Sequence, residues 1–141
     1  MAHALTASVA LVAGDHFTAT TGSGGQTPME PTNTTAPTGA ISPMEALLVA
    51  LGGCMGMSVA PMLRKMRQQV TRYELRVSGA LSERHPRVFE AITVEHIMAG
   101  DGLEAAAIER ALTLAEERYC GASAMLRKAV EITHHLTILA A

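Results

Sequence analysis

The pattern of hydrophobic and polar positions changes its period several times along the chain. Stretches in which apolar and polar residues alternate are typical of strands with one buried face. Such strands are predicted at residues 4–12, 72–82, 88–98 and 130–138, with a second short strand at 17–20 after a turn. Residues 21–41 are rich in Gly, Thr and Pro and are expected to form a long loop, with room for one short strand near 26–30. The polar turn Glu-Arg-His-Pro-Arg separates the strands at 72–82 and 88–98 and predicts an antiparallel hairpin.

Helical spacing of apolar residues appears in three places. The first is a long helix over about residues 43–66, where Pro61 is expected to cause a kink. The second follows the helix-start signal Asp101-Gly-Leu-Glu104 and continues to about Tyr119. Beyond it, Gly121 is expected to break the chain, and Ser123 to cap a short helix over 124–129.

The long helix is the stretch around which the chain is organised. Ser42, Pro43 and Glu45 form a helix start with a Ser-x-x-Glu capping box. Apolar residues then occur on every side of the helix, which is typical of a helix that is buried in a core, buried in an interface or inserted in a membrane. Small residues and a proline make it a poor membrane span, so it is interpreted as a central helix buried in protein. These residues are Gly52, Gly53, Gly56, Ser58 and Pro61.

Composition narrows the class of protein. The 141 residues fit one domain, residues 1–141, and 48% hydrophobic against 17% charged residues favours an oligomer. The net charge of −2 and the lack of a basic cluster interleaved with aromatic residues argue against nucleic-acid binding. Because neither lysine nor arginine precedes Arg64, a positively charged signal-peptide start is missing and a cytoplasmic location is expected.

Cys54 lies in the middle of the long helix and is the first candidate for chemistry. A buried cysteine in an apolar helix often acts only as a small hydrophobe. A nucleophilic cysteine needs a lowered pKa, and the residues one turn away from Cys54 carry no charge. If Gly52 and Gly53 interrupt the helix, Cys54 instead starts a new segment whose dipole favours the thiolate.

Cys120 and Glu45 are the other candidates. Cys120 is either an ordinary residue at a helix end or the partner of Cys54 in an attacking and resolving pair, and their separation in sequence does not decide which. Glu45 has a structural role in the capping box. Nine residues of regular helix place Glu45 and Cys54 on opposite sides, so a joint site needs Glu45 from a second subunit.

The histidines are expected to be mainly structural. His134 falls on the apolar face of the last predicted strand with Ile132 and Leu136, which predicts a hydrogen-bonded core histidine. No C-x-x-C or H-x-x-x-H spacing occurs, so a zinc site is not expected.

Four segments of the chain together resemble the OsmC/Ohr family, which comprises osmotically inducible protein C and the organic hydroperoxide resistance proteins. The similarity is nearest to the YhfA-like branch of this family and spans about residues 42–141. The segments are Ser42-Pro-Met-Glu45, Ala-Leu-Gly-Gly-Cys54 with the following Leu-Arg-Lys-Met, Glu-Arg-Tyr-Cys120, and Met-Leu-Arg-Lys-Ala-Val-Glu-Ile-Thr-His134.

This resemblance implies an α+β fold with antiparallel sheets, a long buried central helix and an intertwined homodimer. It also implies a peroxidase without metal, haem or other bound cofactor. Cys54 would attack an organic hydroperoxide or hydrogen peroxide, Cys120 would resolve the sulfenic acid as a disulfide, and an external dithiol would reduce that disulfide. Glu45 matches the active-site glutamate of the family. No nucleic-acid or membrane partner is implied.

One position departs from the family pattern. Family peroxidases use an N-terminal arginine to hold the peroxidatic thiolate, and no arginine or lysine precedes Arg64 here. His16, Arg64 and Arg67 are the candidates to replace it. The alternative function is therefore a non-enzymatic OsmC-fold protein that binds an apolar small molecule at the dimer interface.

Overall fold

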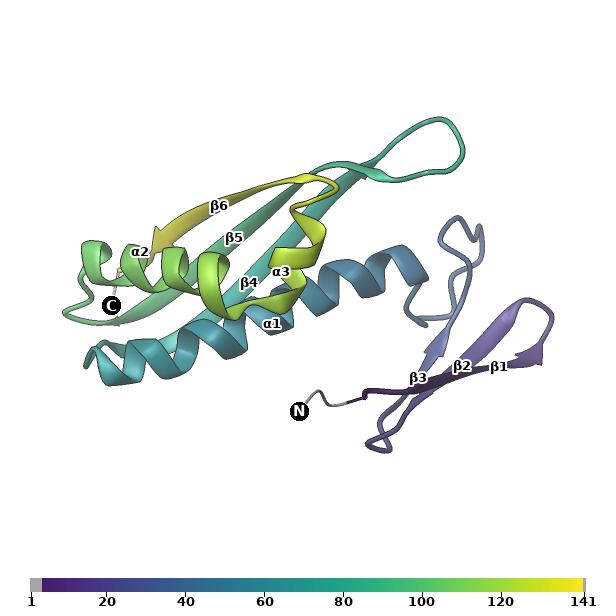
Figure 1. The fold of residues 1–141 in the computed structure, drawn as a ribbon, viewed down its shortest axis with the longest axis horizontal. Coiled ribbons are helices and arrows are strands. Elements are labelled where there is room, and N and C mark those ends of the chain that lie inside the picture. Colours follow the sequence, from purple (N-terminus) through teal and green to yellow (C-terminus); the bar gives the residue numbers. More distant parts are fainter. Residues whose placement is uncertain (1–3, 141) are drawn as a thin grey trace. The chain divides into compact units, whose positions relative to one another are not determined.

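The computed structural model describes residues 4–140. The chain divides into two compact units, one that ends at Leu47 and one that begins at Leu48. Compact units of this kind can belong to one domain or to two. The single domain expected over residues 1–141 therefore stays a prediction. Figure 1 shows the order of the elements along the chain.

The first unit contains a three-stranded antiparallel sheet. Its strands are β1 (Ala7–Ala13), β2 (His16–Thr21) and β3 (Gln26–Met29), in the order β1-β2-β3. β1 and β2 lie at the two predicted strands, and β3 is the short strand within the expected loop 21–41. Apolar residues of β1 are exposed within the chain: Val9 is 56%, Leu11 60% and Val12 67% accessible.

Helix α1 (Pro43–Lys65) starts at the predicted capping box. The Ser42 amide donates to Glu45 Oε1 at 3.1 Å, and the Glu45 amide donates to Ser42 Oγ at 3.3 Å. The helix has the length and apolar composition of a membrane span, two properties that it shares with core helices of soluble proteins. Within the chain only one stripe of the helix is buried, whereas Val49 (61% exposed) and Met57 (80% exposed) lie outside that stripe.

The hypothesis that glycines interrupt this helix before Cys54 is wrong, because α1 is continuous from Pro43 to Lys65. The glycines serve close packing instead. A Cβ atom on Gly52 would lie 3.0 Å from Val77 Cγ2, and one on Gly56 would lie 3.0 Å from Leu75 Cδ1. Glycine therefore allows α1 to approach the sheet of the second unit.

That sheet contains β4 (Gln69–Leu81), β5 (Phe89–Asp101) and β6 (Glu131–Ile138) in the order β4-β5-β6. Strands β4 and β5 form the predicted antiparallel hairpin. The expectation that the sheets are purely antiparallel is wrong for β6, which pairs parallel to β5. The physical reason is the helical connection between them, since a crossover long enough to hold helices returns the chain in the same direction.

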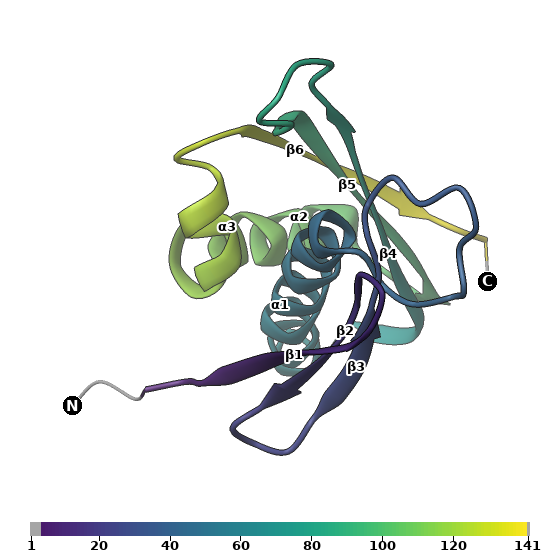
Figure 2. The same cartoon turned by 90° about the vertical axis from the view of Figure 1, so that its right-hand side faces the viewer.

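The connection consists of α2 (Ala105–Leu114), the π-helical turn η1 (Ala115–Tyr119) and α3 (Gly121–Leu126). Figure 2 shows these elements and the α1 residues of the same unit on one side of the β4-β5-β6 sheet. Glu104, not Asp101, is the N-cap of α2. The predicted break at Gly121 and cap at Ser123 are also wrong, because Cys120 is the N-cap and Gly121 is the first residue of α3.

The core of the second unit lies between these helices and the sheet. It is a continuous cluster of buried apolar side chains from α1, β5, α2 and η1, and it includes Cys120. Partly buried side chains, Cys54 among them, pack against this cluster. Both cysteines therefore belong to the layer between helix and sheet, and the chain has the α+β architecture that was expected.

Candidate functional site

The two cysteine side chains come together at the helical layer of the second unit. Cys54 reaches this place from the middle of α1, and Cys120 from the junction of η1 and α3. Both are free thiols, Cys54 half-buried and Cys120 buried at 1% exposure. The Cys54 side chain lies near enough to Cys120 to raise the pKa of the Cys120 thiol. The tertiary fold thus joins two residues that the sequence separates widely.

Local backbone structure fixes each thiol. The Ser58 hydroxyl donates to the Cys54 carbonyl at 2.8 Å, which is a bond within α1. The Cys120 amide donates to the Ala115 carbonyl at 2.7 Å and closes the π-helical turn. Cys120 Sγ then accepts a 3.3 Å hydrogen bond from the Ser123 amide, so the thiol caps α3.

The surroundings of Cys120 favour its neutral form. Burial is the main cause, and together with the neighbouring Cys54 side chain it raises the pKa of the Cys120 thiol to about 11. The Ser123 amide opposes this shift because it stabilises a thiolate. At neutral pH Cys120 is therefore a thiol, and Cys54 is the member of the pair that is open to a small reactant.

An apolar groove lies between α1 and β4 in the same unit, and Cys54 is not among the residues that line it. The groove has a volume of about 420 Å³. Apolar side chains and two glycines line it: Leu48, Val49, Gly52, Gly53, Leu75 and Val77. Since α1 is a regular helix, the Cys54 side chain points away from the side of α1 that lines this groove.

Glu45 lies in the first turn of α1, with its Oε1 atom in the capping box. The hydrogen bonds with Ser42 hold the pKa of Glu45 below its ordinary value. Because α1 is unbroken, Glu45 and Cys54 of one chain point to opposite sides of the helix, about 2.5 turns apart. The capping role of Glu45 is thus confirmed, and its catalytic role stays a prediction.

The three candidates for the family arginine have different surroundings. His16 Nε2 lies 3.4 Å from Glu30 Oε2, and that buried carboxylate also accepts hydrogen bonds from Thr38, which lower its pKa. Arg64 lines a cavity of about 230 Å³ at the end of α1. Among the described residues, neither Arg64 nor Arg67 has an ion-pair partner. His16 is thus the candidate with a defined anionic partner.

The hydrogen-bonded pair of half-buried Tyr73 and fully buried His96 was missed from the sequence. The Tyr73 hydroxyl lies 2.7 Å from His96 Nδ1, and His96 Nε2 lies 3.0 Å from His134 Nδ1. His134 is the hydrogen-bonded core histidine that was predicted. His96 continues the alternation of Ile92 and Val94 along β5, and that alternation was the available signal for its burial.

The fold and the cysteine pair define a member of the OsmC class of proteins. A family model described as OsmC-like protein matches residues 36–135, and the chain belongs to this family. "Protein YhfA" of Escherichia coli K12 is 42% identical over 100 residues, which are 71% of this chain and 75% of that protein.

Solved structures show the same fold. A hypothetical protein from Aquifex aeolicus superposes with a TM-score of 0.87 at 26% identity, over 99% of each chain. The organic hydroperoxide resistance protein OhrB of Bacillus subtilis superposes with a TM-score of 0.66 at 17% identity, over 94% of this chain and 98% of its own. A protein of organic hydroperoxide resistance is thus among the chain's structural neighbours.

Proposed function

We propose that this protein is a thiol peroxidase that reduces organic hydroperoxides or hydrogen peroxide. The observation that carries the proposal is the proximity of Cys54 and Cys120, with Cys120 held as a neutral thiol. A peroxidatic and a resolving cysteine need this pairing, because the first is oxidised by peroxide and the second must then reach the oxidised sulfur.

In the first step the Cys54 thiolate attacks the terminal oxygen of the hydroperoxide. The O–O bond breaks, Cys54 becomes a sulfenic acid, and the alcohol leaves after it takes up a proton. In the second step Cys120 attacks the sulfenic sulfur, a disulfide forms, and water leaves with the Cys120 proton. An external dithiol then reduces the disulfide by exchange and is itself oxidised to a disulfide.

The proposal extends to a homodimer. Glu45 would serve the Cys54 site of the second chain, since the regular helix turns it away from Cys54 of its own chain. Exposed apolar side chains on α1 and β1, among them Met57 and Val9, are the surfaces that a second copy would cover. Neither a bound metal nor a prosthetic group takes part in these steps.

The first experiment is a measurement of intact mass and free thiols after one equivalent of an organic hydroperoxide. We expect rapid loss of both thiols and of two hydrogens in the wild type. The control variant Cys54→Ser should keep its remaining thiol. If both wild-type thiols survive, the peroxidase proposal is wrong.

The apolar groove between α1 and β4 favours a second candidate function, the binding of an apolar small molecule. Its lining has no charged side chain, which suits an aliphatic ligand better than a polar one. Substitution of Val49 by Asp would place a carboxylate in the groove and should abolish binding of a fluorescent fatty acid. Peroxide-resistant thiols together with saturable binding of this probe would favour the second function.

A further inference from the structure

A row of polar side chains crosses the otherwise apolar face of the β4-β5-β6 sheet. It runs from Tyr73 on β4 through His96 on β5 to His134 on β6, by the two hydrogen bonds described above. His134 Nε2 then lies 3.5 Å from Glu116 Oε2 in η1 and has no hydrogen-bond partner among residues 4–140. Tyr73, His96, His134 and Glu116 are called the imidazole row below.

One arrangement of protons satisfies both hydrogen bonds of the imidazole row and also directs an N–H group of His134 at the Glu116 carboxylate. Burial raises the pKa of Tyr73, so its hydroxyl keeps its proton and donates to His96 Nδ1. His96 Nε2–H then donates to His134 Nδ1. The proton of neutral His134 therefore lies on Nε2, on the side of the Glu116 carboxylate.

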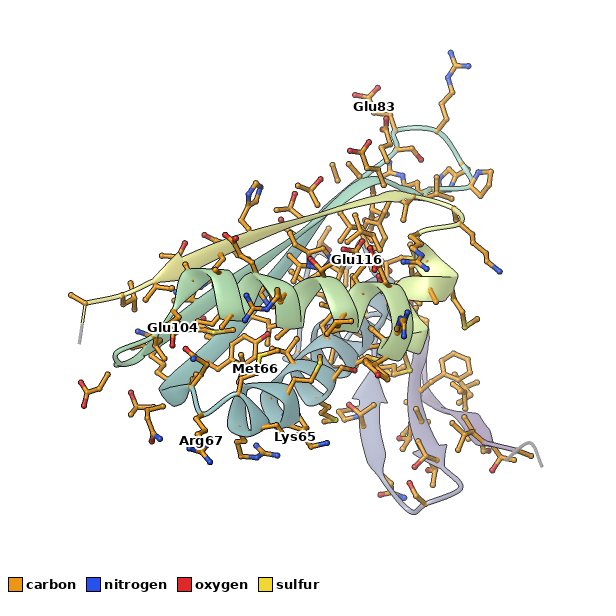
Figure 3. The ribbon with its side chains drawn as sticks, turned by 60° about the vertical axis from the view of Figure 1, so that its left-hand side comes forward. Lys65, Met66, Arg67, Glu83, Glu104 and Glu116 are labelled. Atoms are coloured by element: carbon orange, nitrogen blue, oxygen red, sulfur yellow. The ribbon has the colours of Figure 1, made fainter. Side chains whose placement is uncertain are left out.

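Glu116 connects this row to Cys120. It lies in the π-helical turn whose closing hydrogen bond runs from the Cys120 amide to the Ala115 carbonyl. Arg127 Nη1 donates to the Glu116 carbonyl at 2.9 Å and holds the main chain of the turn. Figure 3 shows Glu116 on the side of the helical segment that faces the sheet. The turn is thus held by its main chain on one side and by the Glu116 carboxylate on the other.

The burial of polar side chains of the imidazole row lowers the free energy gained on folding, because these groups lose their hydration. His96 is fully buried, and an apolar side chain at that position would avoid the desolvation of two ring nitrogens. A network of this kind fixes orientation, because each hydrogen bond limits the rotamer of the next ring. Its outer end is the turn that ends at Cys120.

We propose that Glu116 and His134 are positioning residues for Cys120: the imidazole row holds the Glu116 side chain, and with it the turn that presents Cys120 to Cys54. The inference rests on the proposed function for its use, since resolution of a Cys54 sulfenic acid requires this placement. The geometry itself is testable through the Cys54–Cys120 disulfide alone.

The contact between His134 Nε2 and the Glu116 carboxylate should depend on pH, because His134 can take up a proton. The titratable groups around His134 are His96 on β5, Glu116 on η1, His135 on β6 and Glu109 on α2, which lines the same cavity of about 310 Å³. Burial lowers the pKa of His134, His135 lowers it further, and Glu116 raises it. His134 is therefore neutral at pH 8, and protonation at lower pH converts its contact with Glu116 into an ion pair.

The test compares the wild type, Glu116→Gln and the matched control Glu117→Gln as full-length proteins in glutathione redox buffers from pH 5.5 to 8.5. Glu117 lies next to Glu116 in the same turn but is exposed. Mass spectrometry after acid quenching gives the fraction with the Cys54–Cys120 disulfide. We expect Glu116→Gln to lower the equilibrium constant for this disulfide most at pH 5.5, the acid end of the series, by up to about threefold, the size of one partly exposed ion pair.

At pH 8 the two proteins should differ little, and Glu117→Gln should follow the wild type throughout. A ratio of one at every pH, or a ratio that does not change with pH, would overturn the proposal. A parallel treatment with organic hydroperoxide separates the two proposals. If peroxide leaves the wild-type thiols intact, the peroxidase function fails, while the glutathione series still decides whether Glu116 positions Cys120.

Discussion

Burial distinguishes the two thiols at the scale of single residues. Cys120 is 1% exposed and caps α3 with its sulfur, whereas Cys54 is half-buried. A buried thiol with a raised pKa is a poor first nucleophile at neutral pH, because the thiolate is the reactive form. The same thiol is suited to attack a sulfenic acid that forms next to it.

Replacement of Cys120 by Ser tests this division of roles. Cys120→Ser should still form a sulfenic acid at Cys54, because the peroxidatic residue is intact, but the intramolecular disulfide should disappear. Trapping with a sulfenic-acid reagent, followed by mass spectrometry, measures both species. If the variant turns over normally with a dithiol reductant, Cys120 is not needed for resolution.

At the scale of elements, the capping box sets the start of α1. Ser42 is 2% exposed and exchanges two hydrogen bonds with Glu45, so both side chains are committed to the first turn. Continuity of the helix beyond this turn places Cys54 on the stripe that meets the core of the second unit.

Ser42→Ala should lower the free energy of unfolding by about 1 kcal/mol, since the Glu45 amide loses its acceptor. Urea unfolding followed by circular dichroism measures this change. Ser58→Ala, in the interior of the same helix, is the control and should stay within about 0.5 kcal/mol of the wild type. Equal effects of the two substitutions would contradict the importance of the cap.

The β4-β5-β6 sheet should make stability depend on pH through His96. Burial is the main cause that lowers the pKa of His96 to about 4, from an ordinary value of 6.5, and the charge of His134 lowers it further. Between these values the unfolded chain binds more protons than the folded chain. Stability is therefore fully present above pH 6.5 and falls as the pH falls towards 4, by about 2 kcal/mol or more.

Urea midpoints between pH 7.5 and 4.5 measure this loss. The range stops at pH 4.5, the ordinary pKa of the hydrogen-bonded carboxylates of Glu30, Glu45 and Glu74, whose own contribution is lost mainly at lower pH. His96→Leu should flatten the dependence, whereas His85→Gln, at an exposed position of the hairpin turn, should keep it. An unchanged slope in His96→Leu would show that other groups cause the loss.

At the scale of the whole molecule, apolar surface remains uncovered in a single chain. On α1 the side chains of Val49 and Met57 are 61% and 80% exposed, beside the buried stripe. Such a surface is unusual for a soluble monomer and is typical of an interface.

We therefore expect light scattering at micromolar concentration to give twice the mass of one chain. Met57→Lys should weaken the dimer about tenfold or more, because an ammonium group would be buried in the interface. Met125→Lys is the matched control, since Met125 on α3 is also 76% exposed and lies outside the proposed face. A monomeric wild type would contradict the dimer.

The sequence alone determined the elements whose signals are local. The capping box, the alternating strands and the polar turn between β4 and β5 act over a few residues, so their positions could be predicted. The motifs around Glu45, Cys54, Cys120 and His134 also identified the family. His134 was assigned to the core because alternation places it between apolar neighbours.

Only the tertiary structure decided the features that depend on contacts between distant segments. The parallel pairing of β6, the close approach of Gly52 and Gly56 to β4, and the meeting of Cys54 with Cys120 are of this kind. His96 was missed because its partners, Tyr73 and His134, lie 23 and 38 residues away. Local spacing carries no information on such pairs, since the packing of the whole unit brings them together.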